Sequence, residues 1–318
     1  MSKIPLLIDT DPGVDDALAL LMAFNDPHHD VVGLTICAGN VGLDHTVANA
    51  LKLCEAVGRA DVPVFAGADR PLLHPAGDAG DIHGSDGFGD AGMAPAAQAV
   101  QREHAALAIL RLSHEHAGRL LLVALGPLTN LALALRLDPT LPQRVARCVV
   151  MGGAVTGQGN VTEVAEFNAW FDPEAAKIVF EAIPRVELAD WEAVLRHPLG
   201  VADTEAWMRA PGPQAPFYAA ISHFTLDWWR ERGHAHWCCA DALAMALALE
   251  PGAAAPLQER TLAVELAHGP ARGATMVDWD RAGAGPANAA ILMEYDQARF
   301  EALVRGALAG LHEGPGAG

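Results

Sequence analysis

The sequence feature that most constrains the fold is a run of eight residues near the N-terminus, Asp9-Thr10-Asp11-Pro12-Gly13-Val14-Asp15-Asp16. The apolar stretch 4–8 precedes it and reads as a short buried strand. Residues 17–24 follow it, and their apolar side chains continue one helical face. Pro12-Gly13 is typical of a sharp turn. The order strand, tight turn, amphipathic helix therefore predicts an α/β unit whose connection is rich in aspartate.

The four aspartates of this run indicate a cation site. Asp9 and Asp11 are expected on one face at the end of the strand, and Asp15 and Asp16 in the first turn of the helix. Their carboxylates repel one another at neutral pH, and a helix N-terminus offsets only about 0.3–1 kcal/mol per charge. A hard divalent cation, calcium or magnesium, would offset far more. The plainer alternative is that these are ordinary acidic residues at a strand end and a helix start.

Composition excludes several classes of protein. The chain has 318 residues, 51% of them hydrophobic, which is a soluble globular profile, and we expect residues 1–318 to form a single domain. Its net charge of −18 argues against nucleic acid or an anionic membrane surface as a partner. No signal peptide or membrane span is expected. Five cysteines, including the vicinal pair Cys238-Cys239, fit buried thiols in a reducing cytoplasm better than a disulfide scaffold.

Strand and helix patterns alternate through the first 180 residues. Strands are predicted at 31–36, 62–65, 120–125 and 145–151, and helices at 43–57, 105–116, 128–137 and from Pro173 onwards. This alternation predicts a doubly wound, mostly parallel sheet flanked by helices, with ligands beyond the carboxyl ends of its strands. Later segments predict a helix at 217–232, strands at 262–266 and 275–279, a last helix at 296–311 and a flexible tail at 312–318.

Further polar groups follow the predicted strands. Asn40 ends a small-residue turn after the second strand, and His83 lies in a long segment, 67–100, that is rich in glycine, proline and alanine. Glu166 and Asn168 are two residues apart, so an extended backbone would point both the same way, as a sugar diol requires. Asp241 begins an apolar helix, where a simple N-cap is the alternative explanation.

Taken together, these motifs resemble those of the nucleoside hydrolases, the calcium-dependent inosine-uridine preferring N-ribohydrolases. The resemblance rests on the aspartate run, Gly39-Asn40, the His-Gly-x-x-Gly-x-Gly stretch at 83–89 and the run 160–176 with its Glu-Phe-Asn triplet. It covers almost the whole chain. It implies an open α/β fold, hydrolysis of ribonucleosides to ribose and free base in nucleoside catabolism and purine salvage, and a homodimer or homotetramer.

The resemblance also implies roles for particular residues. Calcium would be held by the side chains of Asp11, Asp16 and Asp241 and by the backbone carbonyl of Leu125. Asp11 would take the proton of the attacking water, Asp15 and Asn40 would orient water and sugar, and His83 would face the base. The ribose would be held by Met151, Asn160, Glu166 and Asn168.

At one position the chain departs from the family pattern. Ala240 stands directly before Asp241, where many members carry a histidine that protonates the leaving base and purine-preferring members carry tryptophan. Loss of one general acid typically costs about 10²–10⁴-fold in rate. The proton would come from His83, His234 or His236, or the preferred substrate would need little of it. Trp228-Trp229 reads as core or interface, or as an aromatic contact to the base.

Two alternatives from other classes are compatible with parts of the pattern. A phosphatase of the haloacid-dehalogenase type also places Asp-x-Asp after a strand beside magnesium, and it would use Asp9 as its nucleophile. The Pro-Gly-x-Asp-Asp continuation and the Glu-Phe-Asn triplet speak against it. A catalytically silent relative that binds ribose or nucleosides is the second alternative, and Ala240 motivates it.

Overall fold

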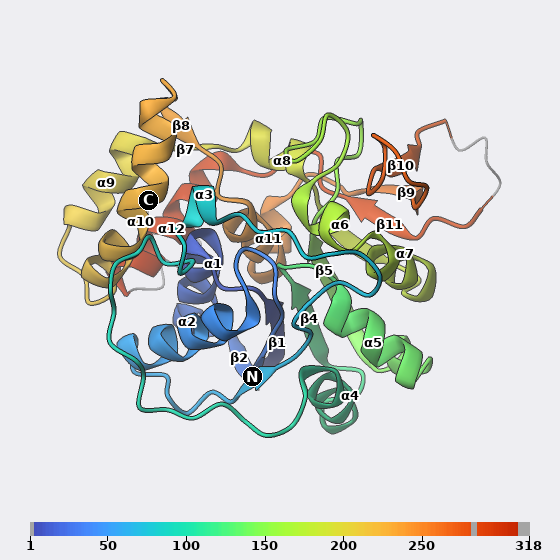
Figure 1. The fold of residues 1–318 in the computed structure, drawn as a ribbon, viewed down its shortest axis with the longest axis horizontal. Coiled ribbons are helices and arrows are strands. Elements are labelled where there is room, and N and C mark those ends of the chain that lie inside the picture. The colour runs from blue at the N-terminus through green and yellow to red at the C-terminus, as the bar shows by residue number, and fades with distance from the viewer. Residues whose placement is uncertain (1–2, 281–284, 311–318) are drawn as a thin grey trace.

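The computed structural model describes residues 3–280 and 285–310, and a large sheet runs through the middle of this part of the chain (Figure 1). Its nine described strands lie in the order β10-β9-β11-β6-β5-β4-β1-β2-β3. The strands are β1 (Ile4–Thr10), β2 (His29–Ile36), β3 (Val64–Ala66), β4 (Leu120–Ala124), β5 (Val145–Met151), β6 (Val186–Ala189), β9 (Gln258–Val264), β10 (Thr275–Asp278) and β11 (Ala289–Ile291). The neighbours from β11 to β3 are parallel, and β9 is antiparallel to β10 and β11. The predicted doubly wound, mostly parallel sheet is confirmed.

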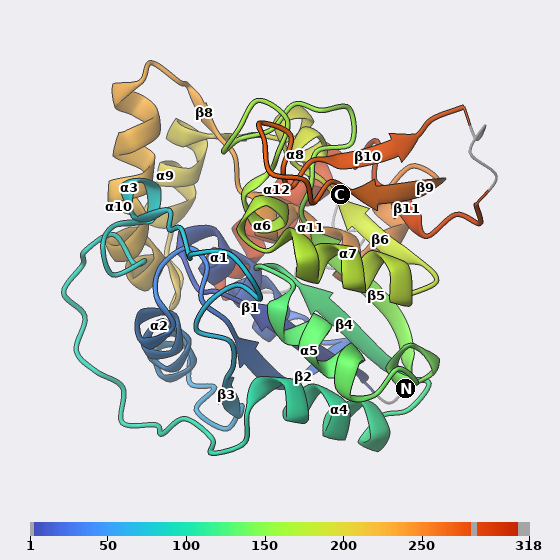
Figure 2. The same ribbon diagram turned by 45° about the vertical axis from the view of Figure 1, so that its right-hand side comes forward.

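Helices cover both faces of the sheet. They are α1 (Val14–Asn25), α2 (Leu43–Ala56), α3 (Gly80–His83), α4 (Ala105–Glu115), α5 (Thr129–Leu137), α6 (Phe167–Phe171), α7 (Pro173–Ala182), α8 (Trp191–Arg196), α9 (Val201–Arg209), α10 (Ala215–Glu231), α11 (Ala240–Leu249) and α12 (Gln297–Ala309). The core on one face is shared by α1, α2, α11 and α12, and the core on the other by α4, α5 and α7 (Figure 2). Side chains of β1 alternate between the two: Leu6 and Ile8 join the first core and Leu7 the second.

Helix α11 is the most deeply placed of these elements. All ten of its residues are buried, and it packs against α1 and against strands β4, β5 and β6. Its alternating alanine, leucine and methionine side chains leave no polar face after the first turn, as the sequence predicted. Because α1 and α11 lie against each other, their first turns are brought to the same end of the sheet.

The strand order contains a topological switch beside β1. The chain passes from β1 outwards to β2 and β3, then returns to place β4 on the other side of β1. The connections that follow β1 and β4 lead to opposite sides of the sheet, and this leaves a crevice at the carboxyl ends of these two strands. The aspartate run follows β1, so the switch fixes where its carboxylates lie.

Most element ends differ from the predicted ones by one or two residues. Strand β9, however, begins four residues before its predicted start, and α3, α6 and β11 were not predicted. In residues 184–236 the pattern predicted one helix, and the structure has β6, α8, α9, α10 and the small ribbon of β7 (Leu199–Gly200) and β8 (His236–Trp237). The final helix starts at Gln297 with Asp296 as its N-cap, and the predicted tail lies outside the described residues. Within the described residues, no helix has the length and apolar character that crossing a membrane requires.

Candidate active site

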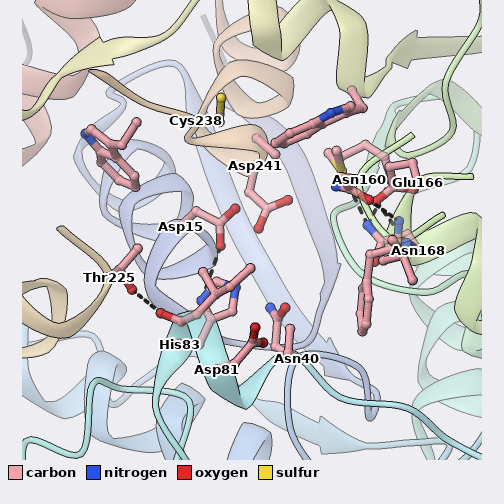
Figure 3. A pocket seen from close by; sticks show the side chains of 18 of the residues that line it. Asp15, Asn40, Asp81, His83, Asn160, Glu166, Asn168, Thr225, Cys238 and Asp241 are labelled. Atoms are coloured by element: carbon pink, nitrogen blue, oxygen red, sulfur yellow. Dashed lines mark hydrogen bonds and ion pairs between the residues drawn. The ribbon is translucent and has the colours of Figure 1, made fainter. Parts of the chain in front are cut away.

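A pocket of about 630 Å³ opens at the carboxyl edge of the sheet (Figure 3). Residues at the ends of neighbouring strands and in the first turns of two helices meet there. Those predicted from the sequence are Asp11, Asp15, Asn40, His83, Leu125, Met151, Asn160, Glu166, Asn168 and Asp241. Asp16 lies directly behind this wall, fully buried and outside the pocket lining.

Three carboxylates converge where α1 and α11 begin. Carboxylate oxygens of Asp15, Asp16 and Asp241 lie within 4.8 Å of one another. Asp16 is fixed by four donors, namely the Thr10 hydroxyl, the Gly13 N–H at 2.9 Å, Asn40 Nδ2 at 2.9 Å and the Asp11 N–H at 3.3 Å. One oxygen of Asp15, Oδ1, is buried and accepts no hydrogen bond. The cluster therefore combines a rigid carboxylate with one whose acceptor capacity is unused.

Asp11 approaches the same cluster from the end of β1. Its Oδ2 accepts the backbone N–H of Asn40 at 2.7 Å. A Cβ atom built on Gly39 would lie 2.0 Å from Oδ2, and one on Gly126 would lie 2.2 Å from Oδ1. The two glycines at neighbouring strand ends thus let the carboxylate pass between them.

The electrostatics of the cluster favour a bound cation. Burial and then the charges of Asp16 and Asp15 raise the pKa of Asp11 well above its usual range. Burial, followed by the neighbouring aspartates, does the same to the pKa of Asp241. Burial raises the pKa of Asp15 to about 6 although backbone N–H groups oppose the shift. Crowded hard oxygen donors with an unused acceptor fit a divalent ion such as calcium or magnesium.

The Glu-Phe-Asn triplet forms the opposite wall, but its backbone is not extended as predicted. Glu166 is the N-cap of α6, and its carboxylate accepts three N–H groups, those of Asn168 at 2.9 Å, Gly153 at 2.8 Å and Ala169 at 3.2 Å. The chain forms a short helix here because its first N–H groups satisfy the buried Glu166 carboxylate. An extended strand would leave that carboxylate without these donors. The side chains of Glu166 and Asn168 still line the pocket. Burial raises the pKa of the Glu166 carboxyl group to about 7.

Asn168 ties this wall to the strands beneath. Its Nδ2 donates to the Leu125 carbonyl at 2.6 Å and lies 3.4 Å from the Met151 sulfur. Asn160 reaches across the loop, where its Oδ1 accepts the N–H of Phe167 at 2.9 Å. The amide oxygen of Asn168 and the amide nitrogen of Asn160 are the groups that these contacts leave for a ligand.

His83 belongs to a helix, and not to an irregular loop as the pattern indicated. It is the last residue of α3, and its Nδ1 accepts the N–H of Val14 at 3.2 Å. Burial lowers the pKa of His83 to about 4, so the imidazole is neutral at pH 7. With Nδ1 accepting, the proton of the neutral ring sits on Nε2. Nε2 can therefore donate a hydrogen bond. Nδ1 lies 3.9 Å from Oδ1 of Asp15.

The remaining wall combines the tryptophan pair Trp228-Trp229, which the sequence offered as a contact to the base, with four residues that sequence reasoning missed, Trp191, Trp237, Asp78 and Asp81. Asp190 and Trp191 directly follow β6, so recognition of that strand would have placed Trp191 at the ligand edge. Asp78, Asp81 and Trp237 have no comparable local signal, because the segment around α3 and strand β8 reach the pocket only through the tertiary fold.

Ala240 and its neighbours lie where α11 meets the pocket. The N-cap of α11 is Cys239, so the simple capping role considered for Asp241 is wrong. Cys238 lines the pocket and Cys239 is buried, and burial raises the pKa of the Cys238 thiol to about 12. His234 also lines the pocket, with its ring 5.2 Å from that of Trp229, whereas His236 is exposed on β8 and does not line it.

Asp9 does not join the cluster that Asp11 reaches. It is fully buried beneath the pocket and does not line it, and its Oδ1 accepts the Thr35 hydroxyl at 2.6 Å and Asn130 Nδ2 at 2.9 Å. Burial raises the pKa of Asp9 to about 7. A nucleophile must reach its substrate, so the phosphatase alternative, which requires Asp9 in that role, has no support in this geometry.

An open α/β sheet with a cluster of carboxylates and amides at its switch point is compatible with a metal-assisted hydrolase. Comparison with known proteins makes the class specific. The sequence profile of the inosine-uridine preferring nucleoside hydrolases matches residues 6–302. The pyrimidine-specific ribonucleoside hydrolase RihA of Escherichia coli O9:H4 (strain HS) is 33% identical over 303 residues, covering 95% of this chain and 97% of that protein.

Solved structures agree with the sequence matches. A plant nucleoside hydrolase, PpNRh1, superposes with a TM-score of 0.91 at 29% identity, covering 97% of this chain and 99% of that one. An inosine-guanosine nucleoside hydrolase superposes with a TM-score of 0.89 at 32% identity over the same shares of the two chains. The chain belongs to the inosine-uridine preferring nucleoside hydrolase family, and its reaction is the hydrolysis of the N-glycosidic bond of nucleosides.

Proposed function

We propose that this enzyme cleaves ribonucleosides to ribose and free base with calcium as its metal, held by Asp11, Asp16, Asp241 and the Leu125 carbonyl. The observation that carries the proposal is the convergence of Asp15, Asp16 and Asp241 within 4.8 Å, in and directly behind the wall of the pocket that the amides of Asn40, Asn160 and Asn168 line. Asp11 is close enough to this cluster to interact with the charges of Asp16 and Asp15. A bound divalent cation would lower the pKa of a coordinated water and accept oxygens of the ribose diol. Oxygen donors that include a backbone carbonyl favour calcium over magnesium.

Asp11 is the base in this proposal. Its carboxylate lies at the pocket floor, beside the cluster that would hold the metal and its coordinated water. The backbone N–H of Asn40 holds one of its oxygens, so the other is free to take a proton from the attacking water. Asp15 and Asn40 line the same floor and would orient the water and the sugar.

The opposite wall fixes the ribose. Glu166 holds Asn168 through the backbone N–H of that residue, and Asn168 in turn contacts Leu125 and Met151. A wall locked by this many hydrogen bonds orients the sugar at little further entropic cost. No covalent glycosyl intermediate is required, because water attacks the anomeric carbon directly while the bond to the base breaks.

The leaving base faces the wall that contains His83, His234 and the tryptophans. His83 would donate a hydrogen bond from its neutral ring, and His234 is the other histidine of the three candidates that lines the pocket. The relatives differ in the bases that their names record, pyrimidines for one and inosine and guanosine for another.

The oligomeric state, a homodimer or a homotetramer, stays a prediction that light scattering would test. The cytoplasmic location also stays a prediction.

The test is a panel of nucleosides assayed by release of reducing sugar. Inosine, adenosine, uridine and cytidine are incubated with the protein after chelation and after calcium is added back. We expect hydrolysis with calcium, loss of activity with chelator and recovery on calcium addition but not on magnesium addition. Activity that is insensitive to chelation would refute the metal assignment.

The silent relative is the second candidate, and Ala240 favours it because alanine supplies no proton. Isothermal titration with ribose separates the two functions. Ribose binding without turnover of any riboside would establish a binding protein and exclude the proposed reaction.

A further inference from the structure

The charge of the pocket is one-sided. Asp78 and Asp81 add two carboxylates to those of the acidic cluster and Glu166, and Asp81 lies beside His83 and Asn40 (Figure 3). Among the described residues that line the pocket, none is a lysine or an arginine. A cleft lined by one sign of charge between low-dielectric walls concentrates ligands of the opposite sign. The pocket therefore attracts cations even beyond the metal cluster.

The wall for the base is aromatic as well as acidic. Four tryptophans line the pocket, and the ring of Trp229 meets that of Trp228 edge-on at 5.3 Å. The face of a tryptophan attracts a cation by about 0.5–1 kcal/mol at an exposed site and by about 2 kcal/mol or more when desolvated. The fold already shows this preference, since the Arg232 guanidinium carbon lies 3.7 Å from the centre of the Trp228 ring. Arg232 does not line the pocket.

The first turn of α11 offers no proton to a leaving group. Ala240 lines the pocket with a methyl group, and it lies directly beside Asp241. A neutral base expelled from a riboside departs with the electron pair of the C–N bond and becomes an anion unless it is protonated. A base that already carries a positive charge departs neutral and needs no proton.

We infer that the preferred substrates are ribosides whose base is cationic, such as N-ribosylpyridinium compounds and 7-alkylpurine ribonucleosides. The inference rests on the proposed function and names the substrate class of that site. The water oxygen bonds to the anomeric carbon, and the C–N electron pair moves to the ring nitrogen and cancels its charge. The proton of the water goes to Asp11. The acidic residues and tryptophans of the pocket favour a positively charged base. No proton donor is needed beside such a leaving group, so the methyl group of Ala240 is sufficient there.

The experiment compares kcat/KM for N-ribosylnicotinamide and 7-methylinosine with kcat/KM for inosine and uridine, all with calcium. We expect the cationic ribosides to be favoured by at least about 10²-fold, the low end of what one general acid contributes. Ala240→His controls for the intrinsic lability of cationic ribosides. It should raise kcat for inosine at least tenfold and change kcat for 7-methylinosine less than twofold.

A second variant tests the charge of the pocket independently of Ala240. The double variant Asp78→Asn/Asp81→Asn should lower the ratio of kcat/KM for cationic over neutral ribosides severalfold, chiefly by raising KM for the two cationic ribosides. Equal kcat/KM values for cationic and neutral ribosides, or equal acceleration of both by Ala240→His, would overturn the inference and leave the proposed function standing. Cleavage of no riboside of either kind would overturn both.

Discussion

At the scale of single residues, the position of Asp11 depends on what its neighbours lack. Gly39 and Gly126 contribute no side chain, and a Cβ atom on either would fall within 2.2 Å of a carboxylate oxygen of Asp11. A real Cβ never approaches an oxygen this closely, so the carboxylate or the turn would have to move. The position of the proposed catalytic base thus depends on two glycines that have no chemistry of their own.

Gly39→Ala is therefore expected to displace Asp11 and to impair catalysis without unfolding the sheet. A misplacement of about 1 Å in a reacting group costs on the order of 10²-fold in rate. We expect kcat to fall by at least that factor, with weaker calcium binding in isothermal titration. Gly42→Ala is the matched control in the same turn, because nothing lies within 4 Å of the Cβ that it would add. Equal kcat values for the two variants would show that Asp11 is not held by the glycine turn.

At the scale of elements, the sugar-binding wall depends on the cap of a five-residue helix. Glu166 satisfies the N–H groups at the start of α6 and that of Gly153 at the end of β5, so one carboxylate joins the helix to the sheet. Hydrogen bonds to a charged group contribute about 1.5–3 kcal/mol each. Glutamine in its place would present an amide N–H to one of these donors.

Glu166→Gln is expected to weaken sugar binding by roughly 10–100-fold, the equivalent of one lost charge-assisted hydrogen bond. The effect should appear in KM for nucleosides and in the Kd of ribose measured by titration. Glu163→Gln removes an exposed carboxylate three residues earlier in the same loop and should leave both values unchanged. The capping role would be contradicted if the two variants bound ribose equally well.

The elements also show what the sequence can and cannot predict. The aspartate run and Asn40 were found because they follow apolar strand patterns, Asp241 because it begins an apolar helix, and Glu166 and Asn168 because of their spacing of two residues. Trp191 was missed because strand β6 was not recognised, and Asp78 and Asp81 were missed because the segment around α3 reaches the pocket only through tertiary packing. The triplet was placed correctly in the pocket, but its backbone was predicted as extended because the two-residue spacing was read as a strand. The local cap, in which Glu166 accepts the N–H groups of Asn168 and Ala169, was not considered.

At the scale of the whole molecule, the switch point concentrates buried acids in the middle of the protein. Burial raises the pKa of Asp9 and of Glu166 to about 7 and that of Asp15 to about 6. In the unfolded chain these groups titrate near pH 4. Between pH 4 and pH 7 the folded protein therefore binds more protons than the unfolded chain. Its free energy of unfolding must fall as the pH rises through this window.

We thus expect the Tm of the chelated protein to fall from pH 5 to pH 8, and the increase in Tm on adding calcium to be larger at pH 8. Calcium requires deprotonated ligands and so competes with the same protons. At a hundredfold excess over Kd it adds about 2.7 kcal/mol, which corresponds to an increase in Tm of roughly 4 °C for a chain of this length.

Asp9→Asn separates the burial of charge from the binding of metal. Asp9 lies outside the pocket lining, and asparagine keeps an acceptor for Thr35 and Asn130. The variant should raise the Tm of the chelated protein at pH 8 by roughly 2 °C or more, since each kcal/mol is worth roughly that in a large domain. At pH 5 Asp9 is already protonated in the folded state, so the variant should change Tm little there. The increase in Tm on adding calcium should persist at pH 8.

Differential scanning calorimetry at the two pH values measures all of these quantities. A chelated protein that gains stability between pH 5 and pH 8 would show that the buried acids are not the groups that set its pH dependence.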